Sequence, residues 1–281
     1  MANQLVMCDD AIIRQMGVLR DNALSTAELR LYKANITPAH GDVIGDYTPS
    51  EADFTGYGSA LPTWAAVTIA SNRAQSTGSP ISWTKLGATG NTIYGYFIRR
   101  PGGYLVGAKK FASTIDMNDD GDNMTVQPIG TLVDQAIKNA GSSSFVWTNY
   151  ALQQFADVLV ATTDGLWACT LHLFKDSGLT PSRSDTISTY TSLGVEADFS
   201  GYGAVGIGWQ ADVLVSNQVR IPANQIVWTK NGAIGNTIYG YFIVDNVGRL
   251  VGAKKYDTPV AMTANGQQHT QQLVYTIESE A

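Results

Sequence analysis

Hydrophobic and polar residues alternate along most of this chain in short runs, a pattern that is typical of half-buried β-strands. In LRLYK (29–33) the two leucines face one way while Arg30 and Tyr32 face the other, and LHLFK (171–175) repeats this alternation. Turns rich in Gly, Pro, Asn and Ser separate such runs, which predicts about seven or eight short strands in each half. The other runs of the first half are TWAAVTIA (63–70), ISWTK (81–85), NTIYGYFI (91–98), YLVGAKKF (104–111) and NMTVQPI (123–129).

The two halves of the chain are copies of each other. GNTIYGYFI occupies Gly90–Ile98 and returns unchanged at Gly235–Ile243, 145 positions later. At the same offset, EADFTGYG (51–58) faces EADFSGYG (196–203). Each unit is about 100 residues long, the size of a compact β domain. The chain is therefore predicted to be mainly β, with two tandem antiparallel β-sandwich or jelly-roll-like domains and short helical segments before and between them.

The repeat also sets the predicted domain boundaries. These are an N-terminal helical segment 1–28, a first β-sandwich repeat 29–130, a helical connector 131–168 and a second repeat 169–281. Within each unit, GNTIYGYFI is expected to be a central strand that serves as scaffold. A glycine inside a strand marks a bulge or a close approach of a backbone or a ring, and we predict this role for Gly95 and Gly240.

Segments outside the β units have helical periodicity. In Asp9–Leu19 the apolar residues Ile12, Ile13, Met16 and Leu19 recur on one stripe. Asp9 and Asp10 stand where an N-cap and a first helical turn favour negative charge. Two further helices are predicted, Thr131–Asn139 and Tyr150–Val160. The last of these lies ahead of the second unit as Asp9–Leu19 lies ahead of the first, which indicates that the duplication included a leading helix.

Composition and charge argue against several classes of partner. Charged residues are 15% of the chain, against about 25% in typical soluble domains. The net charge is −6 and no run of Lys and Arg is longer than two, so no nucleic-acid partner is expected. No apolar run is long enough to cross a bilayer and MANQLVMCDD has no basic and apolar signal regions, so neither a membrane partner nor a signal peptide is expected. Cys8 and Cys169 are expected to be reduced, buried thiols.

The sharpest candidate for a metal site is the acidic segment DMNDDGDNMTVQ (116–127). Its opening matches the spacing of a calcium-binding loop, and the candidate oxygen ligands are Asp116, Asn118, Asp120 and Asp122. However, Gln127 stands where such a loop has its bidentate glutamate, and the flanks have β periodicity. In the second repeat, Asn265-Gly266 replaces Asp120-Gly121. Because both dipeptides favour a turn, a hairpin tip is the preferred interpretation over a cation site.

No catalytic constellation can be nominated from the sequence. The three histidines are not at the spacing of a metal pair, and no nucleotide-binding or nucleophile-elbow motif occurs. Glu51 and Asp53 recur as Glu196 and Asp198. Two carboxylates at i and i+2 share one face of a strand, whereas a glycosidase needs them on opposite sides of a cleft. We therefore expect these carboxylates to make turn and strand-end hydrogen bonds, and we expect no catalytic residues and no cofactor.

Recurring aromatic residues are a further candidate. Tyr94 and Tyr96 recur as Tyr239 and Tyr241, and Trp83 recurs as Trp228. Exposed rings of this kind can stack on sugars, but core packing explains most of them.

Two lysine pairs follow an apolar strand at the same place in each repeat, Lys109 and Lys110 in the first and Lys254 and Lys255 in the second. The pleat of a strand points one lysine of each pair outward. These lysines are predicted either to protect a sheet edge or to contact an acidic partner, and the sequence does not separate the two.

The β units resemble a β-domain family of tailed-bacteriophage virion proteins. The resemblance rests on Leu31–Lys33, Thr37–Pro38, Glu51–Tyr57, Asn91–Phe97 and their second copies. It implies a non-enzymatic structural role in the virion, first of all as a capsid cement or decoration protein. The partners it implies are the major capsid protein or other virion subunits, and further copies of the chain in a homo-oligomer. The alternatives are a tail, neck or fibre-base component and a carbohydrate-binding or host-adhesion module.

Overall fold

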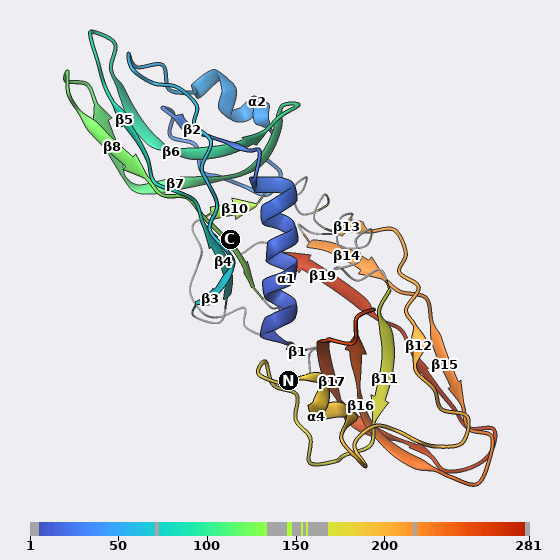
Figure 1. Cartoon of the computed structure of the whole chain (residues 1–281). Coiled ribbons are helices and arrows are strands. Elements are labelled where there is room, and N and C mark those ends of the chain that lie inside the picture. The colour runs from blue at the N-terminus through green and yellow to red at the C-terminus, as the bar shows by residue number, and fades with distance from the viewer. Residues whose placement is uncertain are drawn as a thin grey trace.

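The computed structural model describes residues 6–70, 73–133, 145–147, 153, 156, 168–215 and 218–278. The chain is mainly β, as the alternating pattern predicted, and its strands form several antiparallel sheets. Figure 1 shows two β lobes at opposite ends of the molecule, with the helix α1 (Asp9–Leu19) between them. The two lobes are the two sequence repeats.

Repeat one forms three antiparallel sheets, with strand orders β10-β7-β6-β2, β5-β8 and β3-β4-β9. Their strands are β2 (Glu28–Tyr32), β3 (Thr68–Ala70), β4 (Arg73–Thr77), β5 (Ile81–Thr84), β6 (Asn91–Arg100), β7 (Tyr104–Met117), β8 (Asn123–Val126), β9 (Ile129–Val133) and β10 (Phe145–Trp147).

Repeat two follows the same plan, with strand orders β1-β17-β16-β11-β12, β15-β18 and β13-β14-β19. Its strands are β11 (Thr170–Phe174), β12 (Val205–Gly206), β13 (Val213–Val215), β14 (Gln218–Pro222), β15 (Ile226–Thr229), β16 (Asn236–Val244), β17 (Leu250–Met262), β18 (Gln268–Gln271) and β19 (Val274–Glu278), together with β1 (Val6–Met7). The repeated sequence is therefore a repeated fold.

The repeated stretch GNTIYGYFI forms β6 and β16, each an interior strand of its main sheet. A register shift lies between Ile93 and Gly95, and the same shift precedes Gly240 in repeat two. A Cβ atom on Gly95 would lie 2.1 Å from the backbone oxygen of Lys109 and 2.4 Å from the hydroxyl of Tyr32. The glycine therefore marks both a bulge and a close approach, as predicted.

The main sheet of repeat one is buried on both faces. The short helix α2 (Ile44–Tyr47) covers one face, where the Tyr47 ring lies 5.4 Å from that of Tyr32 and 5.3 Å from that of Phe97. Tyr96, next to Phe97, points to the opposite face and joins the larger core that includes Trp83 of β5. In repeat two, Tyr190 of α4 (Ile187–Thr191) takes the place of Tyr47.

In each main sheet, one of the two outer strands comes from the segment that precedes the other repeat. β10 lies ahead of repeat two, yet it pairs with β7 of repeat one, with Val146 opposite Ala108. β1 lies ahead of repeat one, yet it pairs with β17 of repeat two, with Val6 opposite Ala253. Because Ala108 and Ala253 are equivalent positions, these are the same pairing made twice. The two repeats are joined by a reciprocal exchange of their leading strands.

Helix α1 and Cys8, the residue before it, also contact repeat two. Its Arg14 reaches Asp245 in the turn between β16 and β17, with 3.6 Å between Nη2 and Oδ2. Tyr275 of β19 donates a hydrogen bond of 2.5 Å to Oε1 of Gln15. The Cys8 thiol donates to the backbone oxygen of Leu250 at 2.8 Å. The helix that precedes repeat one is therefore fastened to repeat two.

The predicted helix over Asp9–Leu19 is confirmed, and Ile12, Met16 and Leu19 are buried. The prediction of an aspartate at the N-cap is wrong, because Cys8 takes the cap position. Gln15 lies on the buried stripe as well, where its hydrogen bond to Tyr275 compensates for its lost water contacts.

The connector differs from its prediction. The helix expected over Thr131–Asn139 is wrong for residues 131–133, which extend β9, and its other residues lie outside the described part of the chain. Of the helix expected over Tyr150–Val160, only residues 153 and 156 are described, and both are helical. Cys8 and Cys169 are buried thiols, as predicted. In the described part of the chain, no helix is both long and apolar enough to cross a bilayer.

Candidate functional site

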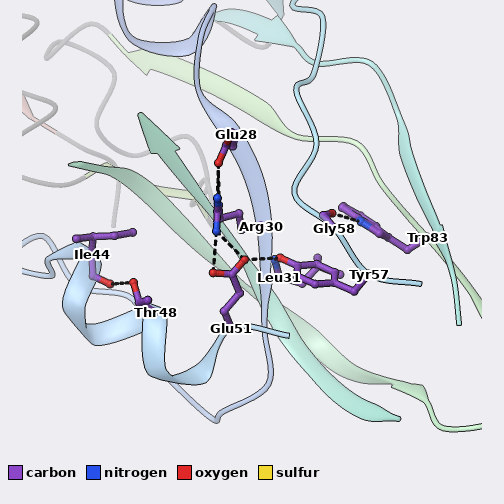
Figure 2. A network of polar contacts seen from close by, with 9 residues as sticks. All are labelled: Glu28, Arg30, Leu31, Ile44, Thr48, Glu51, Tyr57, Gly58 and Trp83. Atoms are coloured by element: carbon purple, nitrogen blue, oxygen red, sulfur yellow. Dashed lines mark hydrogen bonds and ion pairs between the residues drawn. The ribbon is translucent and has the colours of Figure 1, made fainter. Parts of the chain in front are cut away.

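A polar network of repeat one joins the EADF segment to β2 (Figure 2). Arg30 donates from Nη1 to both carboxylate oxygens of Glu51 at 2.9 Å, and from Nε to Glu28 at 2.9 Å. The hydroxyl of Tyr57 donates to Glu51 at 3.0 Å and accepts the backbone N–H of Leu31 at 3.0 Å. Burial raises the pKa of Tyr57, and the Glu51 carboxylate raises it further. The Glu51 carboxylate thus accepts hydrogen bonds from the Arg30 guanidinium on one side and from the Tyr57 hydroxyl on the other.

Repeat two preserves the carboxylate and the phenol but changes the cation. Tyr202 donates to Glu196 at 2.8 Å, and His172 takes the place of Arg30, with its Nδ1 also 2.8 Å from Glu196. A carboxylate can only accept, so Nδ1 of His172 carries the proton. Its Nε2 lies 2.9 Å from the hydroxyl of Thr170, which donates when the ring is neutral. The imidazole is therefore saturated by local partners.

The second carboxylate of the EADF segment belongs to another network. Asp53 forms an ion pair of 2.5 Å with Lys33 and accepts a hydrogen bond of 2.9 Å from Asn91. These bonds, from Lys33 first and Asn91 second, lower the pKa of Asp53. Lys175, Asp198 and Asn236 repeat the arrangement. Both carboxylates of the segment form hydrogen bonds and ion pairs that join neighbouring segments of the chain, as the sequence led us to expect. These contacts give Glu51 and Asp53 a structural role.

Replacing Glu51 by glutamine tests this structural role. The variant keeps the side-chain shape but loses the charge that faces the Arg30 guanidinium, and both groups are mostly buried. We expect the free energy of unfolding to fall by about 1–2 kcal/mol, measured by denaturant titration. Asp119→Asn, at an exposed position between β7 and β8, is the control and should change stability by less than about 0.5 kcal/mol. If the two variants have equal free energies of unfolding, the Glu51 carboxylate does not stabilise the fold in this way.

A buried lysine in each repeat was not anticipated. Lys85 and Lys230 are 2% and 1% exposed, and each ammonium group donates to a carbonyl oxygen of its own loop, that of Gly87 or Gly232. Lys230 also donates to Asn265 at 3.2 Å, so it ties the β15–β16 loop to the β17–β18 loop. The signal was present in the sequence, because Lys85 lies two residues after Trp83 and so shares its inward register.

The acidic segment is a turn, but it does not close a hairpin. β7 pairs with β6 while β8 pairs with β5, so residues 118–122 carry the chain from one sheet to another. Asp122 accepts the backbone N–H groups of Asn118 and Asp119 at 2.9 and 2.7 Å. Asp120 accepts that of Gly87 at 2.8 Å, and Asp116 accepts the Thr92 hydroxyl at 2.7 Å. These contacts hold the turn in shape and join it to the β5–β6 loop and to β6.

Of the predicted cation ligands Asp116, Asn118, Asp120 and Asp122, the three aspartates therefore already accept hydrogen bonds from the protein, and Asn118 donates its backbone N–H to Asp122. Within the ranges that the structure describes, no group of three or more His, Cys, Asp or Glu side chains is placed to hold a metal ion. The segment is better understood as an acidic surface that repeat two lacks.

The lysine pairs lie on β7 and β17, half-buried. The edge-protection interpretation is wrong for Lys109, because β10 pairs with β7 at that residue and covers the edge. Lys110 and Lys255 lie close to loop oxygens, the Thr37 hydroxyl at 3.4 Å and the Ser177 carbonyl at 2.7 Å. For all four lysines, contact with an acidic partner stays a prediction.

The recurring aromatic residues are mainly core. Trp83 and Trp228 are 5% and 2% exposed, and each indole N–H donates to a backbone oxygen, at 2.7 Å to Gly58 in repeat one. Tyr96 and Tyr241 are buried too. These four rings cannot form a sugar platform, because they do not reach the surface.

The networks of the two EADF segments are two matching sets of polar contacts that join the strands and loops of each repeat. Comparison of the chain with family models, with curated protein sequences and with solved structures found no match.

Proposed function

We propose that this chain is a non-enzymatic structural protein of a tailed-phage virion, in which two tandem sandwich domains cement the capsid by bridging neighbouring shell subunits. The observation that carries the proposal is the placement of two copies of one β lobe at opposite ends of the molecule (Figure 1). A chain built in this way offers two similar binding faces. It suits a partner that is itself present in many equivalent copies, since two modest contacts on one chain reinforce each other.

The loops farthest along each lobe are the proposed contact surfaces. In repeat one the β5–β6 loop exposes Leu86, 55% accessible, and in repeat two the β15–β16 loop exposes Ile234, 57% accessible. The two side chains stand at different positions of the same repeated loop. The buried lysine of each loop, Lys85 or Lys230, donates a hydrogen bond to a carbonyl oxygen of the same loop and so restrains the loop conformation. A preorganised loop with an exposed aliphatic side chain loses little entropy when it binds, which favours association.

The test is the copy number of this chain in purified particles, measured by quantitative mass spectrometry against the major shell protein. We expect a fixed ratio with many copies per particle, and we expect the double variant Leu86→Asp, Ile234→Asp to be lost from particles. The control is Val247→Asp, which changes an equally exposed residue in the β16–β17 turn and should be retained. A few copies per particle, located on tails, would instead support a tail, neck or fibre-base component.

A further inference from the structure

Repeat two contains a polar cluster at a place where repeat one is apolar. Three residues replace apolar counterparts that lie 145 positions earlier, namely Tyr256 for Phe111, His269 for Met124 and Gln271 for Val126. They come from β17 and β18, and His269 lies against the preserved Trp228 of β15, with 5.8 Å between ring centroids and 14° between ring planes. The three replacements coincide in space, so they form one structural feature.

The cluster is a directed chain of hydrogen bonds. Gln271 donates from Nε2 to the backbone oxygen of Gln272 at 2.9 Å, which leaves its Oε1 to accept the Tyr256 hydroxyl at 3.0 Å. The single phenol proton is then used, so the contact of 2.8 Å between Tyr256 and Nε2 of His269 has the ring nitrogen as donor. These contacts place a proton on Nε2 of His269, and Nδ1 is the site that a second proton would take.

The surroundings oppose a charge on this ring. His269 is 8% exposed, and burial lowers its pKa. The ionisable group in contact with it is the phenol of Tyr256, whose ring lies 5.9 Å from that of Tyr241. Two cations belong to the strands that pack against it or to their ends. Lys254 lies two residues before Tyr256 on β17, and Lys230 lies two residues after Trp228 beyond the end of β15. Among the described residues, His269 has no carboxylate partner that would stabilise the imidazolium.

We propose that the Tyr256–His269–Gln271 chain is a pH-sensitive latch that holds the β15–β18 ribbon against β17 at neutral pH and releases it in acid, in repeat two alone. The sign follows from linkage. As the pH falls below the ordinary range for histidine, about 6.5, the open state takes up a proton that the closed state resists. The closed state is therefore favoured above that range and loses stability below it. Phe111, Met124 and Val126 give repeat one no such dependence.

The experiment is hydrogen–deuterium exchange of the full chain at about pH 7.5 and about pH 5, with opening equilibria corrected for the intrinsic exchange rates. We expect a several-fold rise in opening for peptides from β15 and β18 in acid, and no such rise for those from β5 and β8. The triple variant Tyr256→Phe, His269→Met, Gln271→Val, which installs the residues of repeat one, should abolish the rise.

The matched control is His172→Arg, which also installs the residue of repeat one but lies outside the cluster, and it should keep the rise. His269→Gln serves if the triple variant does not fold, and it should also lose the rise. The proposal is overturned if the native chain shows no acid-dependent opening, if β5 and β8 open equally, or if the His269 variants respond as the native chain does.

Discussion

The Gly95→Val variant is expected to lose at least about 3 kcal/mol of stability and to leave repeat one largely unfolded. The added side chain would begin 2.1 Å from the backbone oxygen of Lys109, and no rotamer can move a Cβ atom. The ring of Tyr32 closes the other side, with its Cζ at 2.6 Å. β6 is an interior strand paired on both edges, so it cannot shift without breaking both ladders. Denaturant unfolding followed by tryptophan fluorescence measures the loss.

Two further variants give this prediction its controls. Gly206→Val also places valine on a strand glycine, but nothing lies within 4 Å of its Cβ position, and we expect a change of no more than about 0.5 kcal/mol. Adding Tyr32→Phe to Gly95→Val should give no rescue, because the Lys109 oxygen remains. A stable Gly95→Val protein would show that the close approach does not constrain β6.

Replacing Asp245 by asparagine is expected to cost about 2–4 kcal/mol. The carboxylate is 3% exposed and accepts from the Arg249 guanidinium at 2.8 Å, while Arg14 of α1 lies 3.6 Å away. It also accepts the backbone N–H groups of Val247 and Arg249 at 3.1 and 2.8 Å. Because Arg249 is 38% exposed, solvent screens its interaction with Asp245, and we expect a loss of stability below the upper end of this range. Thermal and denaturant unfolding at neutral pH give the value.

The same carboxylate has a defined pH dependence. Burial alone would raise the pKa of Asp245, but the hydrogen bonds from Arg249 and Val247 outweigh it and the pKa is lowered. Its contribution is therefore complete above the ordinary range for aspartate, about 3.9, and is lost as the pH falls through the lowered value. The difference between the native chain and Asp245→Asn should shrink in strong acid. Asp21→Asn, in an exposed ion pair, is the control, and an equally small effect of both variants at neutral pH would contradict the prediction.

The strands of each repeat could be predicted because their information is local. Alternation in LRLYK and the repetition of GNTIYGYFI predicted β2, β6 and their copies, and the predicted close approach at Gly95 is confirmed by the neighbouring Lys109 carbonyl. The stripe of Ile12, Met16 and Leu19 likewise predicted α1. In all of these cases the physical cause lies within one element and its own periodicity.

Two of the errors concern partners that are distant in sequence. No local pattern in residues 118–122 shows that β7 and β8 join different sheets, so a turn dipeptide was mistaken for a hairpin. The edge of β7 is covered at Lys109 by a strand from beyond the repeat, which the sequence of β7 cannot reveal. Lys85 and Lys230 were missed for another reason, because a lysine is rarely buried unless its ammonium group finds acceptors within reach.

The exchange of leading strands has a consequence for the order in which the chain folds. The pairing of Val6 with Ala253 joins the first described strand to one of the last. A ribosome therefore exposes β1 long before β17 exists, whereas β7 and β10 emerge close together. Because closing a long loop is slow compared with making local contacts, repeat one can complete its main sheet during synthesis. Repeat two must wait for the beginning of the chain to return, and until then β1 and the outer edge of β17 are both unpaired.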